Sequence, residues 1–330
     1  MYFPFVSIII PVKNEAQNII SCLDGIKNQD YPSDRFEVII VDNGSTDGTM
    51  ELINEYKKRK LIKNLSIFQK HDGTIGAVRN YGAQKAKGEI LAFLDGDSVP
   101  HKNWISLGIK ILIIKPEVAC VGFTFQNPEK ETSWIVRTWY KIGRGSKYIK
   151  SGYVEWLSSF NLIIWKKIFE ELGGFNEILE TCEDAELGYR ISKHYKLWFS
   201  NEITVRHLGE AKTLKQFFLK ELWRGKGNLL SFFYSKNKWK DFPSVFIPIF
   251  YVFTHFISIL FSIYLYFFKH DILTTFCIVG YTVIISLPVA LTIRKFKKIS
   301  SILDFIHILT LYYVYLIARG IGPFYRLIKK

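Results

Sequence analysis

Short apolar runs that end in polar side chains recur along the first hundred residues of the chain. Residues 6–12, 36–41 and 90–94 are predominantly apolar, and each run is followed by a polar turn and then by a helical pattern of apolar positions. Runs of this length that are apolar on both faces are typical of central strands in a parallel sheet. Strands that alternate with helices predict an α/β fold built from βαβ units.

The strand predicted at residues 90–94 ends in two carboxylates, Asp95 and Asp97, one residue apart. Open parallel sheets bind their ligands at the carboxyl ends of the strands, and carboxylate oxygens suit Mg²⁺ or Mn²⁺ carrying a diphosphate. A solvated acidic turn is the alternative, because such turns are common after strands. The other two predicted strands favour a binding site, since they run into Asn14 and Asp42 at the same edge.

Two long segments near the C-terminus lack charged residues. Residues 245–268 contain none unless His255 is protonated, and residues 272–293 contain none at all. A helix needs roughly 20 apolar residues to span a bilayer. Buried core helices are the alternative, but the very short link between the segments predicts a transmembrane hairpin.

A third apolar stretch, residues 305–318, is shorter and rich in aromatic residues. It predicts a short membrane or interfacial helix at about residues 300–320. We expect this helix to be interfacial or re-entrant. A full span would place the basic residues at the C-terminus outside, against their preference for the cytoplasmic side.

Basic residues flank the predicted hairpin on both sides. They are Lys236, Lys238 and Lys240 before it, and Arg294, Lys295, Lys297 and Lys298 after it. This distribution predicts a multi-pass protein of the plasma membrane whose preceding domain is cytoplasmic. No signal peptide is expected from the first residues. The four cysteines lack CxxC spacing, so neither a zinc site nor a disulfide framework is expected.

The chain carries a formal net charge of +14, which calls for an anionic partner. The basic residues cluster beside apolar segments and do not interleave with aromatic residues in a patch typical of nucleic-acid binding. Membrane lipid headgroups and the phosphates of a nucleotide or lipid-linked ligand explain the charge better. Nucleic acid is therefore not an expected partner.

Four motifs together resemble the family 2 glycosyltransferases, in their order and spacing. They are SIIIPVKNE at residues 7–15, VDNGSTDGT at 41–49, AVRNYGA at 77–83 and FLDGD at 93–97, and the likeness continues through ELGGFNE at 171–177 and TCED at 181–184. The resemblance covers roughly residues 5–230. It implies a GT-A fold, a Rossmann-like domain that binds nucleotide-diphospho-sugars, at residues 1–235. The membrane region is then residues 236–330.

The resemblance implies donor-binding roles for the first two strand ends. Pro11, Val12, Asn14 and Glu15 are expected to lie under the nucleotide, although Glu15 also suits the first turn of a helix. Asp42 matches the position that binds the base edge. A carboxylate only accepts hydrogen bonds, so it suits the ring N–H of uracil and a UDP-sugar is expected.

The resemblance also implies a metal site. Asp97 is expected to ligate Mg²⁺ or Mn²⁺, with Asp95 contacting the ribose or a metal-bound water. Arg79 should approach the nucleotide and Asp95, the alternative being a solvated helix face. His207 ends a short predicted strand at residues 203–207 and is expected at the metal or diphosphate, although a lone histidine is most often structural.

The pair Glu183-Asp184 is expected to be catalytic. The family places its general base at the position of Asp184, with Glu183 beside it contacting the acceptor. Thr181 and Asp184 also fit a helix capping box, which is the alternative role. A helix N-terminus would keep Asp184 ionised, and Gly174 would let the backbone approach a sugar closely.

The resemblance and the apolar C-terminus together imply a metal-dependent, inverting glycosyltransferase. Its acceptor would be a hydroxyl of a membrane-associated molecule in glycan, exopolysaccharide or glycolipid assembly. Trp223 and Arg224 are expected to cover the diphosphate, although their surroundings match the motif of processive synthases poorly. A polyprenyl-phosphate sugar transferase and a catalytically silent scaffold that binds nucleotide sugars are the alternatives.

Overall fold

The structure, a computed structural model, describes residues 3–129, 132–143, 150–235, 238–268 and 271–325. Its internal contacts group the chain into two units. Unit 1 comprises residues 1–127 and 148–210, and unit 2 comprises residues 128–147 and 211–330. The domain boundary expected at residue 235 falls inside unit 2, and the assignment of functions to residues 1–235 and 236–330 stays a prediction.

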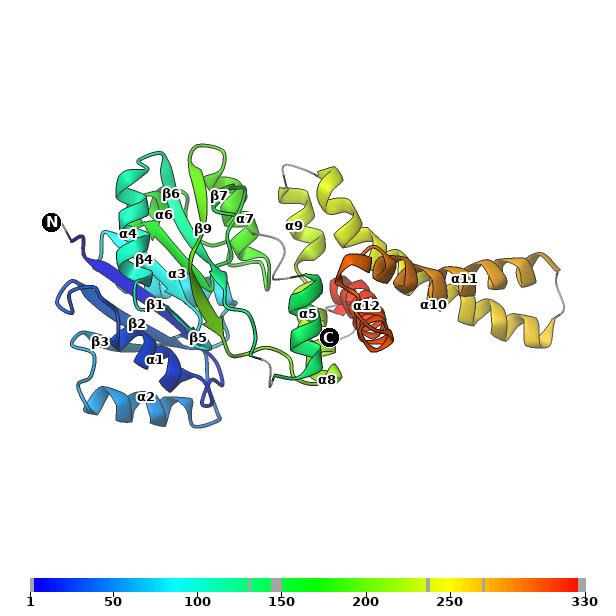
Figure 1. The fold of residues 1–330 in the computed structure, drawn as a ribbon, viewed down its shortest axis with the longest axis horizontal. Helices are drawn as coiled ribbons and strands as arrows, with labels where there is room; N and C mark the ends of the chain where they lie inside the picture. Colours follow the sequence, from blue (N-terminus) through cyan, green and yellow to red (C-terminus); the bar gives the residue numbers. More distant parts are fainter. Residues whose placement is uncertain (1–2, 130–131, 144–149, 236–237, 269–270, 326–330) are drawn as a thin grey trace. The chain divides into compact units, whose positions relative to one another are not determined.

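Unit 1 is built on one mixed sheet with the strand order β3-β2-β1-β4-β8-β6-β9-β5 (Figure 1). Strands β3, β2, β1 and β4 are parallel, β8 is antiparallel to both of its neighbours, and β7 pairs with β9. The strands are β1 Val6–Val12, β2 Phe36–Asp42, β3 Leu65–Gln69, β4 Ile90–Leu94, β5 Ser98–Val99, β6 Val118–Phe125, β7 Gly152–Val154, β8 Asn161–Trp165 and β9 Lys196–His207. The three strands expected from the apolar runs are confirmed. The strand expected at 203–207 is the end of the longer β9.

Helices cover both faces of this sheet. Alternate residues of a strand point to opposite faces, so Ile8 and Ile10 join a core that includes α1 residues, whereas Ile9 joins a core that includes α3 residues. The described helices of unit 1 are α1 Ile19–Lys27, α2 Thr49–Lys58, α3 Ile75–Lys85, α4 Trp104–Ile114, α6 Lys166–Glu171 and α7 Glu183–Ile191. Burial on both faces explains why the strands are predominantly apolar.

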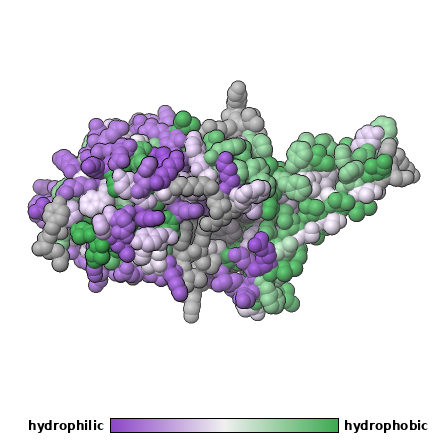
Figure 2. Space-filling model, turned by 90° about the horizontal axis from the view of Figure 1, so that it is seen from above, coloured by the Kyte–Doolittle hydropathy of each residue, from purple (hydrophilic) through white to green (hydrophobic). Residues whose placement is uncertain are grey.

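Unit 2 contains the apolar C-terminal helices. Its described elements are α5 Trp134–Ile142, α8 Leu214–Gly225, α9 Asn228–Tyr234, α10 Lys238–Phe267, α11 Asp271–Ile293, η2 Phe296–Lys298, α12 Ile302–Ile321 and η3 Gly322–Phe324. Three helical segments, residues 241–267, 272–293 and 302–324, are long and apolar enough to span a membrane. In Figure 2 hydrophobic side chains cover the paired helices α10 and α11. The expected hairpin and third apolar helix are confirmed as helices.

A buried ion cluster joins α8 to α12. The carboxylate of Glu221 accepts from Arg319 Nε at 2.7 Å and from Arg224 Nη1 at 2.6 Å. Arg319 also donates to Asn228 Oδ1 at 2.8 Å. Burial opposes ionisation of Glu221, but the two guanidinium groups lower its pKa to about 2. Glu221 is therefore a charged anchor inside unit 2.

Glu221→Gln is expected to lower the thermal unfolding midpoint of the detergent-solubilised chain. The substitution leaves two arginines without their buried counter-charge, and breaking a buried pair costs about 3–5 kcal/mol. Glu55→Gln is the matched control, because the pair of Glu55 with Arg59 is more than half exposed on both sides and contributes about 0–1 kcal/mol. Equal midpoints for the two variants would show that the cluster does not stabilise unit 2.

Candidate functional site

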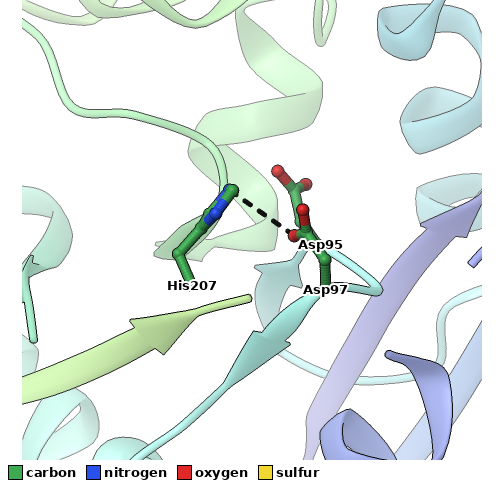
Figure 3. A group of neighbouring side chains, drawn as sticks. All are labelled: Asp95, Asp97 and His207. Carbon is green, nitrogen blue, oxygen red and sulfur yellow. Dashed lines mark ion pairs between the residues drawn. The ribbon is translucent and has the colours of Figure 1, made fainter. Parts of the chain in front are cut away.

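The turn after β4 and the end of β9 bring three candidate metal ligands together. Strand β5 pairs with β9, with Ser98 opposite His207, and the amide of Leu208 donates to the carbonyl of Asp97 at 2.7 Å. One ligand atom from each of Asp95, Asp97 and His207 lies within 4.8 Å of the others. His207 Nε2 is 3.5 Å from Asp97 Oδ1, as Figure 3 shows. These three residues can hold a divalent cation.

Two residues beside this group were not singled out from the sequence. His207 Nδ1 lies 3.5 Å from Glu210 Oε1, so Glu210 faces the side of the imidazole ring away from Asp97. Gly209 packs so closely that an added Cβ would lie 2.0 Å from Asp97 Oδ2. The feature in the sequence that marks them is the short segment His-Leu-Gly-Glu at residues 207–210, which becomes informative only once β9 is known to end there.

Gly209→Ala is expected to lower divalent-cation affinity about 10–100-fold, the range seen when groups supporting metal ligands are changed. The methyl group would clash with Asp97 Oδ2, so the Asp97 carboxylate would have to leave its position in the group. Titration with Mn²⁺ in the presence of a nucleoside diphosphate measures the effect. Gly152→Ala is the control, because an added Cβ there meets nothing within 4 Å. Unchanged affinity in Gly209→Ala would contradict the placement of Asp97 at the cation.

Arg79 bridges the turn after β4 to the start of α7. Its Nη2 donates to Asp95 Oδ1 at 2.6 Å, and its Nη1 donates to Glu183 Oε1 at 2.6 Å. The side chain of Arg79 is only 3% exposed, so the alternative of a solvated helix face is wrong. The expected approach of Arg79 to Asp95 is observed. Its pairing with Glu183, 104 residues away, was not expected.

The pair Glu183-Asp184 begins α7. Cys182 precedes the helix as its N-cap residue, with a positive φ of 67° and no side-chain cap hydrogen bond, so the alternative in which Thr181 caps this helix does not fit the observed helix start. Glu183 is buried against Arg79, whereas Asp184 is partly exposed. Asp184 is thus the more exposed residue of the pair.

Burial dominates the ionisation of this pair. It raises the pKa of Glu183, and the neighbouring charge of Asp184 raises it further, whereas Arg79 lowers it. Burial also raises the pKa of Asp184, whereas hydrogen bonds from Ala185, Ser159 and Ser158 lower it by a smaller amount. The net effect is a pKa of Asp184 above its ordinary value, and the ionised state expected for this carboxylate stays a prediction. A raised pKa makes a carboxylate a stronger base once it is ionised.

Asn80 fixes the glycine-rich segment that precedes α7. Its Nδ2 donates to the carbonyl of Phe175 at 2.8 Å and to Glu177 Oε1 at 2.9 Å, while its Oδ1 accepts from the amide of Phe175 at 2.9 Å. Gly174 has a φ of +71°, and an added Cβ would lie 2.6 Å from Asn80 Oδ1. Glycine is thus required here by the Asn80 contact. The approach of a sugar to Gly174 stays a prediction.

The turns after β1 and β2 are tied to each other. Asn14 accepts from the amide of Thr46 at 2.8 Å, and the amide of Glu15 donates to Thr49 Oγ1 at 2.8 Å. Asp42 accepts from the amides of Gly44 and Ser45 at 3.1 Å.

Pro11 and Val12 are buried at the end of β1, directly before the first of these turns. Their contacts and those of Asn14, Glu15 and Asp42 with a nucleotide stay predictions. Trp223 and Arg224 lie in α8 of unit 2, where Arg224 pairs with Glu221. Their role at a diphosphate also stays a prediction.

Comparison with known proteins identifies relatives of this chain. The model of the glycosyl transferase family 2 matches residues 7–173. Glycosyltransferase AglE of Haloferax volcanii is 32% identical over 229 residues, which are 68% of this chain and 73% of that protein. A dolichyl N-acetyl-alpha-D-glucosaminyl phosphate 3-beta-D-2,3-diacetamido-2,3-dideoxy-beta-D-glucuronosyltransferase of Methanococcus voltae is 27% identical over 64% of this chain and 69% of its own length.

A solved structure shares the fold. The mannosyltransferase PcManGT from Pyrobaculum calidifontis, in complex with GDP-Man and Mn²⁺, aligns with a TM-score of 0.61 at 18% identity, covering 99% of this chain and 88% of that chain. The GT-A fold expected from the motifs is confirmed by this likeness. Because the family model spans just over half of the chain and AglE matches most of it, this protein belongs to glycosyl transferase family 2 and is a glycosyltransferase.

Proposed function

We propose that this enzyme catalyses metal-dependent, inverting transfer of a sugar from a nucleoside diphosphate sugar to a hydroxyl of a lipid-linked acceptor. One observation carries the proposal. Through Arg79, the buried charge network connects the candidate cation ligand Asp95 to the pair Glu183-Asp184. A leaving-group site and a candidate base therefore lie at one end of the same sheet, as a direct displacement requires.

We assign Asp95, Asp97 and His207 to the cation. Two carboxylates and one imidazole fit Mn²⁺ or Mg²⁺, and the three ligand atoms already lie close together. A cation bound there neutralises charge that develops on the departing diphosphate. The Mn²⁺ in the structure of PcManGT supports the assignment.

We assign the base to Asp184 and a positioning role to its neighbour Glu183. Asp184 takes the proton from the acceptor hydroxyl, and the acceptor oxygen forms a bond to the anomeric carbon. The bond from that carbon to the diphosphate breaks on the opposite side, so one displacement inverts the configuration. Glu183 is buried and holds the guanidinium group of Arg79.

A lipid-linked acceptor is supported by the apolar helices of unit 2 and by the relatives. The name of the Methanococcus voltae protein describes transfer to a sugar carried on dolichyl phosphate. We place the enzyme in the plasma membrane with unit 1 in the cytoplasm, because the described basic residues Lys238, Arg294, Lys295, Lys297 and Lys298 flank the hairpin α10–α11 on one side.

A donor panel tests the proposal. The detergent-purified chain is incubated with UDP-, GDP- and TDP-sugars and Mn²⁺, and nucleoside diphosphate release is measured with and without membrane lipid extract. The expected result is release from one donor that the lipid extract stimulates and EDTA abolishes. That donor identifies the nucleotide and the sugar that the enzyme uses. Binding of a nucleotide sugar without release under any condition would favour the silent scaffold.

A further inference from the structure

Charged groups from α5 and α8 bind both ends of α12. Near the start of α12, Lys141 Nζ of α5 lies 2.8 Å from Asp304 Oδ2. Near its end, Arg319 Nε lies 2.7 Å from Glu221 Oε2 of α8. Asp304 and Arg319 are separated by about 22 Å along the helix, at about 1.5 Å per residue.

Aromatic side chains fill the space between these two ion pairs. Trp134 of α5 stacks on His307 of α12 with ring centroids 4.2 Å apart. Trp139 of α5 contacts Tyr315 of α12 at 5.6 Å and Phe217 of α8 at 4.9 Å. The helices α5, α8 and α12 therefore form a layer with its own small core.

The end of α12 also meets the end of α8 backbone to backbone. A Cβ added to Gly322 would lie 2.6 Å from the Cα of Gly225. Only glycine allows two backbones to approach so closely. The C-terminal end of α12 is thus held directly on α8.

The chain reaches α5 and α8 before it reaches a candidate membrane span. Among the described residues, the first such span begins at Asp241. Helix α5 has 9 residues and α8 has 12, and both carry charged side chains such as Arg137 and Lys220. A span needs roughly 20 apolar residues, so α5 and α8 lie on one side of the bilayer. Both ends of α12 are bound to them.

We infer that α12 lies in the plane of the bilayer surface, on the side of α5 and α8, and that the chain crosses the membrane twice, through α10 and α11. The surface that α12 exposes fits the boundary between lipid headgroups and acyl chains. Its exposed side chains are apolar: Ile302, Leu303, Ile306 and Tyr313. The basic residues Lys297 and Lys298, directly before α12, suit anionic headgroups.

Cysteine labelling in sealed vesicles tests the position of both ends of α12. The background is the full-length chain with Cys182→Ser, which removes the half-buried native thiol. One cysteine at a time is then introduced into this background. The four positions are Lys215 in α8, Phe268 directly after α10, Lys297 before α12 and Phe324 after α12. A membrane-impermeant maleimide should label Lys215→Cys, Lys297→Cys and Phe324→Cys from one side and Phe268→Cys from the other. Labelling of Phe324→Cys from the side of Phe268→Cys would show that α12 spans the bilayer.

The depth of α12 in the bilayer is a second measurement, and it does not depend on whether a maleimide can reach the cysteines. Ile306→Cys and Tyr313→Cys, seven residues apart on the exposed face, carry a fluorophore in vesicles of phosphatidylethanolamine and phosphatidylglycerol that contain nitroxide lipids. An in-plane helix predicts equal quenching at the two sites, strongest for nitroxides near the headgroup. Stronger quenching of the Tyr313→Cys label by nitroxides deep in the acyl chains would overturn the inference.

Discussion

Asp184→Asn lowers the rate of sugar transfer to a hydroxyl acceptor by about 10²–10⁴-fold, the usual contribution of a general base. The amide keeps the size of the side chain but cannot take the acceptor proton. Turnover with saturating donor and acceptor measures the loss, and the exposed Asp34→Asn is the matched control.

The fold should survive this substitution. Burial raises the pKa of Asp184, which means that the folded state disfavours its charge, so a neutral side chain does not destabilise it. The thermal unfolding midpoint of Asp184→Asn should therefore equal or exceed that of the unmodified chain. A fall in the midpoint together with activity would point to unfolding as the cause of the lost activity.

The pH dependence of the unmodified enzyme follows from the same raised pKa. Asp184 is protonated and inactive as a base below its pKa, so kcat/KM, which reports ionisations of the free enzyme, should rise with pH and level off above that pKa. The midpoint of this rise should lie above the ordinary value of 3.8 for an aspartate. Full activity of Asp184→Asn would instead favour an acceptor that is already ionised, such as polyprenyl phosphate.

Asp97→Asn is expected to reduce transfer about 10³-fold, equivalent to about 4 kcal/mol of lost transition-state stabilisation. The substitution removes a negative charge from the group formed with Asp95 and His207, so the cation binds more weakly. Titration with Mn²⁺ should show the affinity loss independently of turnover.

Asp34→Asn, which changes an exposed aspartate, again serves as the control. Excess Mn²⁺ should restore part of the activity of Asp97→Asn if weaker binding is the main defect. Wild-type turnover and wild-type Mn²⁺ affinity in Asp97→Asn would show that the cation does not use this carboxylate.

The sequence predicted the first half of the fold well, for a physical reason. Strands β1, β2 and β4 are buried on both faces, so their apolar character marks them without help from distant residues. The long uncharged stretches within α10 and α11 are just as local in origin. By contrast, β9 begins seven residues before its expected start at residue 203, because its first part contains polar and exposed positions.

The contacts that assemble the site could not be predicted from local patterns. Arg79 contacts Glu183 across 104 residues of sequence, and Asn80 contacts Phe175 across 95. Such pairs depend on how α3 and α7 pack on the sheet. The backbone at Cys182 lies in the left-handed region and α7 begins at Glu183, so the alternative role of Thr181 as a helix cap does not fit this start, which the residue types alone did not reveal.

The bridge formed by Arg79 also restricts how this sequence can change over time. One guanidinium group pairs with Asp95 and Glu183 at once, so replacing Arg79 leaves two carboxylates without their shared cation. Substitutions at these positions should be strongly non-additive. Although they lie in three separate motifs, the three residues are expected to be retained or replaced as a set.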